Sequence, residues 1–120
     1  MAFNIYWITI STLCIVGIVK NQDIPKIAPF SFPPNLKIGD IGSVTCSVTS
    51  GSRPLKFQWK KDHIDINENT NVAVLTHSDL SAVSIKSIKE ENIGNYTCTV
   101  SNKYGSNSYM TRLEVPSKLI

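Results

Sequence analysis

Apolar and polar residues alternate over several short runs of the chain, and turn-forming residues separate these runs. In the run 43–48, for example, Val44, Cys46 and Val48 fall on one face, and small polar residues fall on the other. A period of two is typical of strands that bury one face, and the runs show no helical period. Strands are expected over 43–48, 55–60, 72–75, 82–88, 96–102 and 109–115. The pattern predicts an all-β sandwich.

The segments between the runs carry the residues that favour turns. Four prolines lie between residues 25 and 34, so this segment is expected to be an edge strand or a linker, because proline cannot donate to a sheet ladder. The polar stretch 61–71 is expected to be a loop. Gly94 gives backbone freedom to the polar corner 89–95, and Gly105 marks a hairpin turn over 103–106.

Two cysteines, a tryptophan and a tyrosine stand at informative places in this strand pattern. Cys46 and Cys98 lie in separate runs, Trp59 lies between them, and Tyr96 precedes the second cysteine by two positions. This spacing is expected where a disulfide joins strand B of one sheet, here 43–48, to strand F of the other, here 96–102, with 72–75 as strand D between them in the chain. The indole is then expected to pack on the disulfide in the core, and the tyrosine hydroxyl to bond to nearby backbone.

The first residues differ in composition from the rest of the chain. Residues 3–19 are almost wholly apolar or small, and the first charged side chain is Lys20. This pattern predicts a secretory signal peptide. We assign residues 1–22 to the signal peptide, 23–116 to one domain and 117–120 to a tail. No basic residue precedes the apolar run and no good cleavage triplet follows it, so an uncleaved signal anchor remains the alternative.

The cysteine count agrees with secretion. Removal of the signal peptide would remove Cys14 and leave Cys46 and Cys98 as an even pair in an oxidising compartment, where pairing is the default. A zinc site is not expected, because two distant thiols have no second pair nearby. His63 and His77 also do not stand in a finger-like spacing.

Charge and composition exclude several classes of function. The formal net charge is +3, and lysines and arginines are dispersed along the chain, which indicates a solvated surface and no nucleic-acid partner. His63 stands between Asp62 and Asp65, but both histidines fall in polar loops without a nucleophile or a glycine-rich phosphate loop. The sequence therefore predicts no enzyme, no cofactor and no metal.

One motif predicts a covalent modification. Asn95, Tyr96 and Thr97 form the acceptor triplet for N-glycosylation. Strand alternation directs Asn95 and Thr97 outward and Tyr96 inward. We therefore expect Asn95 to be accessible, and the alternative is an unused triplet at a tight corner.

Several stretches resemble a known family. They are Cys46-x-Val48, Trp59 preceded by Phe57, Val83-x-Ile85-x-x-Ile88, and the stretch from Asn92 to Gly105. Together they are similar to the intermediate-type immunoglobulin domain of cell-adhesion receptors, over roughly 25–116. Residues 25–33 and 54–62 resemble, more narrowly, arthropod proteins similar to the Down syndrome cell adhesion molecule.

The resemblance implies an immunoglobulin-like two-sheet Greek-key sandwich with one B–F disulfide. It also implies homophilic or heterophilic protein binding in cell adhesion, neurite guidance or immune recognition. One position departs from the family, since Asn92 stands where the family usually has an aspartate. The ion pair that this aspartate often makes with an arginine on strand D is not expected here.

The expected function is that of an extracellular protein-binding module in cell adhesion or neuronal recognition, secreted or at the cell surface. The alternative is a soluble, secreted, single-domain protein of immune recognition or a decoy. A membrane would be involved only through a missing C-terminal part or an uncleaved signal anchor. Phe30 and Phe32 are a first hypothesis for part of the binding surface, and the alternative is that they pack down as the first strand.

Overall fold

The computed structural model describes residues 23–116, so the predicted signal peptide, Cys14 and the tail 117–120 lie outside the described residues. Eight strands and one short 3-10 helix follow one another along the described chain. They are β1 (Lys26–Ile27), β2 (Gly42–Ser50), β3 (Lys56–Lys61), β4 (Ile64–Asp65), β5 (Val72–Thr76), β6 (Leu80–Ile85), η2 (Glu90–Asn92), β7 (Gly94–Asn102) and β8 (Gly105–Leu113).

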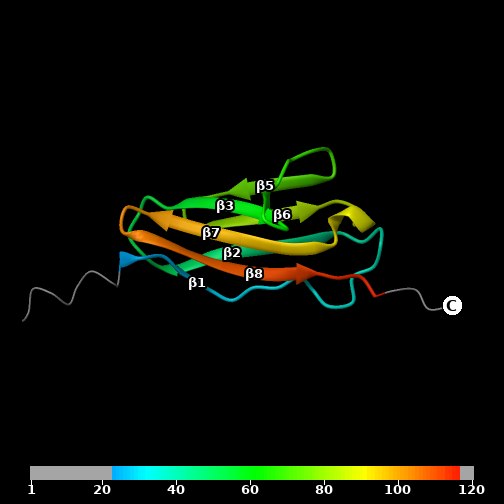
Figure 1. The fold of residues 1–120 in the computed structure, drawn as a ribbon, viewed down its shortest axis with the longest axis horizontal. Helices are drawn as coiled ribbons and strands as arrows, with labels where there is room; N and C mark the ends of the chain where they lie inside the picture. The colour runs from blue at the N-terminus through cyan, green and yellow to red at the C-terminus, as the bar shows by residue number, and fades with distance from the viewer. Residues whose placement is uncertain (1–22, 117–120) are drawn as a thin grey trace, which may run out of the picture.

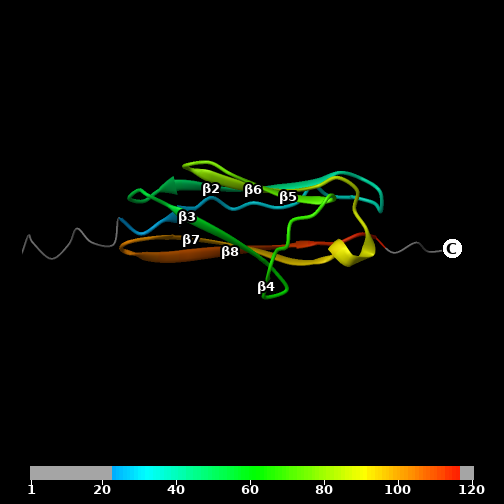
Figure 2. The same cartoon turned by 90° about the horizontal axis from the view of Figure 1, so that it is seen from above.

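The strands form two four-stranded sheets in the orders β1-β2-β6-β5 and β4-β3-β7-β8. Every pair is antiparallel. Figure 1 shows the strands running along the length of the domain, and Figure 2 shows the two sheets as two facing layers. The prediction of an all-β, two-sheet sandwich is confirmed.

Alternation fixes which side chains fill the space between the layers. In β7, Tyr96, Cys98 and Val100 are buried, and the residues between them are half-buried. The same period places Val83 and Ile85 of β6 in the core. The buried apolar cluster consists of Phe32, Val44, Cys46, Trp59, Val72, Val83, Ile85, Ile88, Tyr96, Cys98, Val100 and Leu113.

Most strand ends differ from the sequence expectation by one or two residues, and larger differences occur in three places. The stretch 61–71 is not entirely loop, because β4 pairs with the end of β3 within it. β6 ends at Ile85, and Ile88 reaches the core from outside a strand. β8 begins at Gly105, because its pairing with β7 continues up to a two-residue turn at Lys103 and Tyr104.

Within residues 23–116, no helix has the length and apolar character needed to cross a membrane.

Candidate functional site

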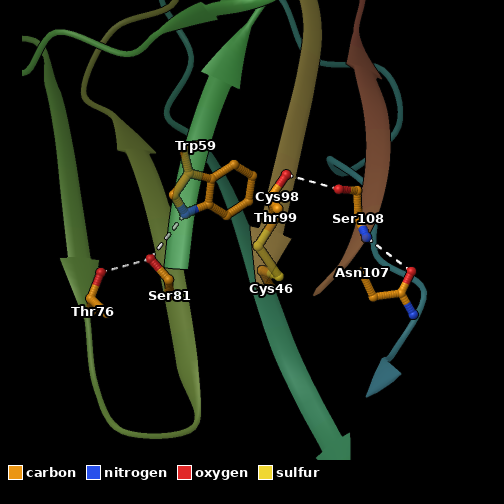
Figure 3. Close-up of a disulfide and its surroundings, with 8 residues drawn as sticks. All are labelled: Cys46, Trp59, Thr76, Ser81, Cys98, Thr99, Asn107 and Ser108. Atoms are coloured by element: carbon orange, nitrogen blue, oxygen red, sulfur yellow. Dashed lines mark hydrogen bonds between the residues drawn. A yellow bond between two sulfur atoms is a disulfide. The ribbon is translucent and has the colours of Figure 1, made fainter. Parts of the chain in front are cut away.

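A disulfide and an indole connect the two sheets at the centre of the core. Cys46 of β2 and Cys98 of β7 are bonded, as predicted, with their Cα atoms 6.4 Å apart. Trp59 of β3 lies beside the disulfide, and its Nε1 donates a hydrogen bond of 2.9 Å to Oγ of Ser81 in β6 (Figure 3). Ser81 is fully buried and also shares a 2.8 Å hydrogen bond with Thr76. The indole N–H is thereby satisfied in an apolar environment.

Sequence reasoning missed Ser81. The alternation of β6 could have identified it, because Ser81 lies two residues before Val83 and four before Ile85 and therefore points inward like them. A polar residue on the inward face of a strand needs a partner. Trp59 Nε1 supplies the donor.

Tyr96 closes the corner that leads into β7. Its hydroxyl donates a 2.6 Å hydrogen bond to the backbone carbonyl of Asn92, four residues earlier. Burial, and to a lesser extent the negative charge of Asp62, raises the pKa of Tyr96 to about 12. Oδ1 of Asn92 accepts a hydrogen bond from the backbone N–H of Lys89, so this asparagine binds backbone where the family usually has an aspartate.

Asp62 supports the beginning of β7 from the turn after β3. Its Oδ1 accepts a 2.9 Å hydrogen bond from the backbone N–H of Asn95, and its own N–H donates to the carbonyl of Asn95. The hydrogen bond from Asn95 and that from Lys61 lower the pKa of Asp62. Gly94 has a positive φ of 156° and leaves room for this carboxylate, because a Cβ there would lie 2.5 Å from Asp62 Oδ2.

Phe30 and Phe32 pack against the core. The ring of Phe32 is buried and meets Tyr96 edge-on at 5.2 Å between centroids. The ring of Phe30 lies 5.8 Å from that of Trp59 and 4.8 Å from that of Tyr109. Both rings contact aromatic side chains of the sandwich, which favours the alternative that this segment packs inward.

The two histidines lie apart from one another on the surface. His63 and His77 are both exposed and lie on separate turns. Among the described residues, histidine, cysteine, aspartate and glutamate do not gather in any group that could hold a metal ion.

The outward residues of β2, β6 and β5 differ in charge from those of β3, β7 and β8, although exposed Lys26 lies on the edge strand β1 and exposed Lys86 directly follows β6. On β2, β6 and β5, the residues that point away from the core form what we call the charge-free face: Ser43, Thr45, Ser47, Ala73, Leu75, Leu80, Ala82 and Ser84. None of these residues is ionisable at neutral pH. Ala82 is central, since it pairs with Thr45 on one side and with Leu75 on the other. Leu75 is 61% exposed.

The outer surface of the other sheet is polar and basic. On β3, β7 and β8, the outward residues form what we call the polar face: Lys56, Gln58, Lys60, Asn95, Thr97, Thr99, Ser101, Ser106, Ser108, Met110 and Arg112. Thr99 is the counterpart of Ala82, because it pairs with Gln58 on one side and with Ser108 on the other. Ala82 and Thr99 thus hold corresponding central positions on two faces of different chemistry.

Comparison with known proteins identifies the class of this sandwich. The family model "Immunoglobulin I-set domain" matches residues 25–115. The chain belongs to the immunoglobulin I-set family.

Its relatives include cell adhesion molecules. The chain is 37% identical over 78 residues to cell adhesion molecule DSCAML1 of Mus musculus. The aligned region covers 65% of this chain and 4% of that protein. It is 32% identical over 94 residues to cell adhesion molecule Dscam1 of Drosophila melanogaster, covering 76% of this chain and 5% of that protein. The chain therefore spans only a small part of the length of these relatives.

The solved structures agree with the fold. The Dscam1 Ig7 domain, isoform 9, superposes with a TM-score of 0.71 at 30% identity, covering 76% of this chain and 98% of that one. The titin M4 domain superposes with a TM-score of 0.70 at 17% identity, which supports the fold alone.

Proposed function

We propose that this domain is an extracellular protein-binding module of the cell-adhesion type, and that it binds a second copy of itself through the charge-free face. The observation that carries the proposal is the lack of charge on the outward residues of β2, β6 and β5. In a twofold pair, the same surface meets itself, so a charged residue near the axis faces its own like charge. A face without charges avoids this repulsion and loses little solvation when it is covered.

The relatives and the core support this proposal. The similar proteins are named cell adhesion molecules, and a disulfide in the core fits an oxidising, extracellular compartment. The domain contributes binding and no catalysis. One face of a domain of this size offers about 800 Å² or less to a partner, so a single contact is weak and arrays of copies are needed for adhesion.

A charge-exchange experiment tests the proposal. The full chain is secreted from insect cells and coated densely on beads, and aggregation of the beads is measured. Wild-type beads are expected to aggregate. Ala82→Glu and Ala82→Lys are each expected to abolish aggregation, because they place like charges at the centre of the paired faces. Mixed beads of these two variants are expected to bind one another.

Thr99→Glu is the matched control. Thr99 has the same central place on the polar face that Ala82 has on the charge-free face, so this variant is expected to aggregate like wild type. Melting curves of all variants establish that they fold. Normal self-aggregation of both Ala82 variants would contradict binding through the charge-free face.

A further inference from the structure

Asn95 combines a backbone held by hydrogen bonds with a side chain that points to solvent. Asp62 holds both polar groups of the Asn95 backbone, through hydrogen bonds of 2.9 Å in each direction. The side chain points to the polar face, because its neighbours Gly94 and Tyr96 are buried. Across the strand pair, Nη1 of Arg112 donates a long, 3.4 Å hydrogen bond to Asn95 Oδ1.

The nitrogen of this side chain is available for modification. Within residues 23–116, Nδ2 of Asn95 makes no hydrogen bond, whereas the amides of Asn71 and Asn102 donate to backbone carbonyls. Thr97 lies on the same face, two residues further along β7, and completes the acceptor triplet.

We propose that Asn95 carries an N-linked glycan, that this glycan covers one end of the polar face, and that it leaves the charge-free face as the binding surface. The donor is an oligosaccharide linked to a lipid diphosphate. The bond from Asn95 Nδ2 to C1 of the first sugar forms, the bond from C1 to the diphosphate oxygen breaks, and Nδ2 loses one proton. The lipid diphosphate leaves with the bonding electrons.

The position of the glycan follows from the two-layer architecture. β7 belongs to the sheet β4-β3-β7-β8, and the charge-free face belongs to the opposite layer (Figure 2). A large hydrophilic group on Asn95 therefore blocks contacts with the end of the polar face near Arg112, and it projects away from the charge-free face. This second part of the inference rests on the proposed function, whereas the modification itself does not.

The modification is tested by mass spectrometry of the full chain secreted from insect cells. Wild type and Thr97→Ser are expected to carry a glycan that a peptide N-glycosidase removes, converting Asn95 to aspartate. Thr97→Val is expected to lack it, because valine keeps the shape of threonine and removes the hydroxyl that the transfer requires. Thr99→Val, on the same strand and face, is the control and is expected to keep the glycan. An unmodified Asn95 in the secreted wild type would overturn the inference.

The role of the glycan is tested with glycans placed on either face. Ser43→Asn creates a new acceptor triplet with Val44 and Thr45 on the charge-free face. It is expected to abolish bead aggregation, and enzymatic removal of its glycan is expected to restore aggregation. Ser106→Asn creates a triplet with Asn107 and Ser108 on the polar face, and it is expected to leave aggregation unchanged.

The outcomes separate the two proposals. Aggregation that increases when the native glycan at Asn95 is removed would show that the glycan covers the binding surface, and it would overturn the inference. Wild-type beads that do not aggregate, with or without the glycan, would overturn the proposed function instead. In that case the mass measurement still decides whether Asn95 is modified.

Discussion

Tyr96 is the residue whose chemistry gives the clearest pH prediction. Burial, and to a lesser extent the negative charge of Asp62, raises its pKa to about 12 from an ordinary value of 10.0, and the protonated hydroxyl donates its hydrogen bond to Asn92. A raised pKa means that this stabilisation is complete below about pH 10 and is lost as the pH rises through about 12. Tyr96→Phe is expected to reduce the free energy of unfolding by about 0.5–1.5 kcal/mol at neutral pH.

The alkaline part of this prediction has its own measurement. Denaturant unfolding is followed at intervals from neutral pH to the pKa of Tyr96, for wild type and for Tyr96→Phe. The difference between the two proteins is expected to shrink as the pH rises, because only wild type loses a bond on deprotonation. An unchanged unfolding curve for Tyr96→Phe at neutral pH would argue against the corner hydrogen bond.

Gly94 is the second residue whose identity the structure explains. The sequence indicates a flexible corner, but it does not indicate that Asp62 occupies the space beside the glycine. Gly94→Ala is expected to cost roughly 1–3 kcal/mol, because alanine disfavours the positive φ and its Cβ displaces the carboxylate.

A double-mutant cycle separates these two causes. In the background of Asp62→Ala, Gly94→Ala is expected to cost less, because the carboxylate that it displaces is already gone. The remaining cost reports the backbone strain alone. Full additivity of the two substitutions would mean that the contact between the Cβ and the carboxylate has no energetic effect.

The strands show which elements of the fold could be predicted from this one sequence. The alternation around Val44, Cys46 and Cys98 predicted the central strands, because a buried face imposes a period of two on the chain. The β4 strand and the start of β8 were not predictable, because each exists through pairing with a neighbour and its residues lack a strong period. The inward packing of Phe30 was left open for the same reason, since its partners come from β3 and β8.

The connection between β3 and β6 gives a prediction at the scale of elements. Trp59 of one sheet donates to Ser81 of the other. Ser81→Ala is expected to cost about 1–3 kcal/mol, because it leaves the buried indole N–H without an acceptor. Trp59→Ala is expected to cost roughly 3–5 kcal/mol, because it also leaves a cavity beside the disulfide.

Trp59→Phe provides the comparison for this hydrogen bond. It keeps an aromatic ring in the core and removes the donor, so Ser81→Ala is expected to cost less in that background than in wild type. Denaturant unfolding of the four proteins measures the difference. A loss of only a few tenths of a kcal/mol for Trp59→Ala would contradict the core position of the indole.

At the scale of the whole molecule, the decisive property is the unequal distribution of charge over the outward residues of the two three-stranded faces. The polar face carries Lys56, Lys60 and Arg112, whereas the outward residues of β2, β6 and β5 carry no charge. An acidic partner or an anionic polymer would be attracted to the first surface. A second copy of the chain is better accommodated on the other, because the outward residues of β2, β6 and β5 bring no like charges together and the lysines Lys26 and Lys86 lie at its margins.

Salt therefore distinguishes the two modes of binding. Raising the ionic strength from about 0.1 M to about 1 M shortens the Debye length from about 10 Å to about 3 Å. Aggregation of beads through the charge-free face is expected to change little over this range, because no ion pairs are screened. Binding to heparin-coated beads, used as a reference for the polar face, is expected to fall steeply, and Lys56→Glu is expected to weaken only that binding. If self-aggregation fell steeply with salt and was also lost in Lys56→Glu, the binding surface would be the polar face and not the charge-free face.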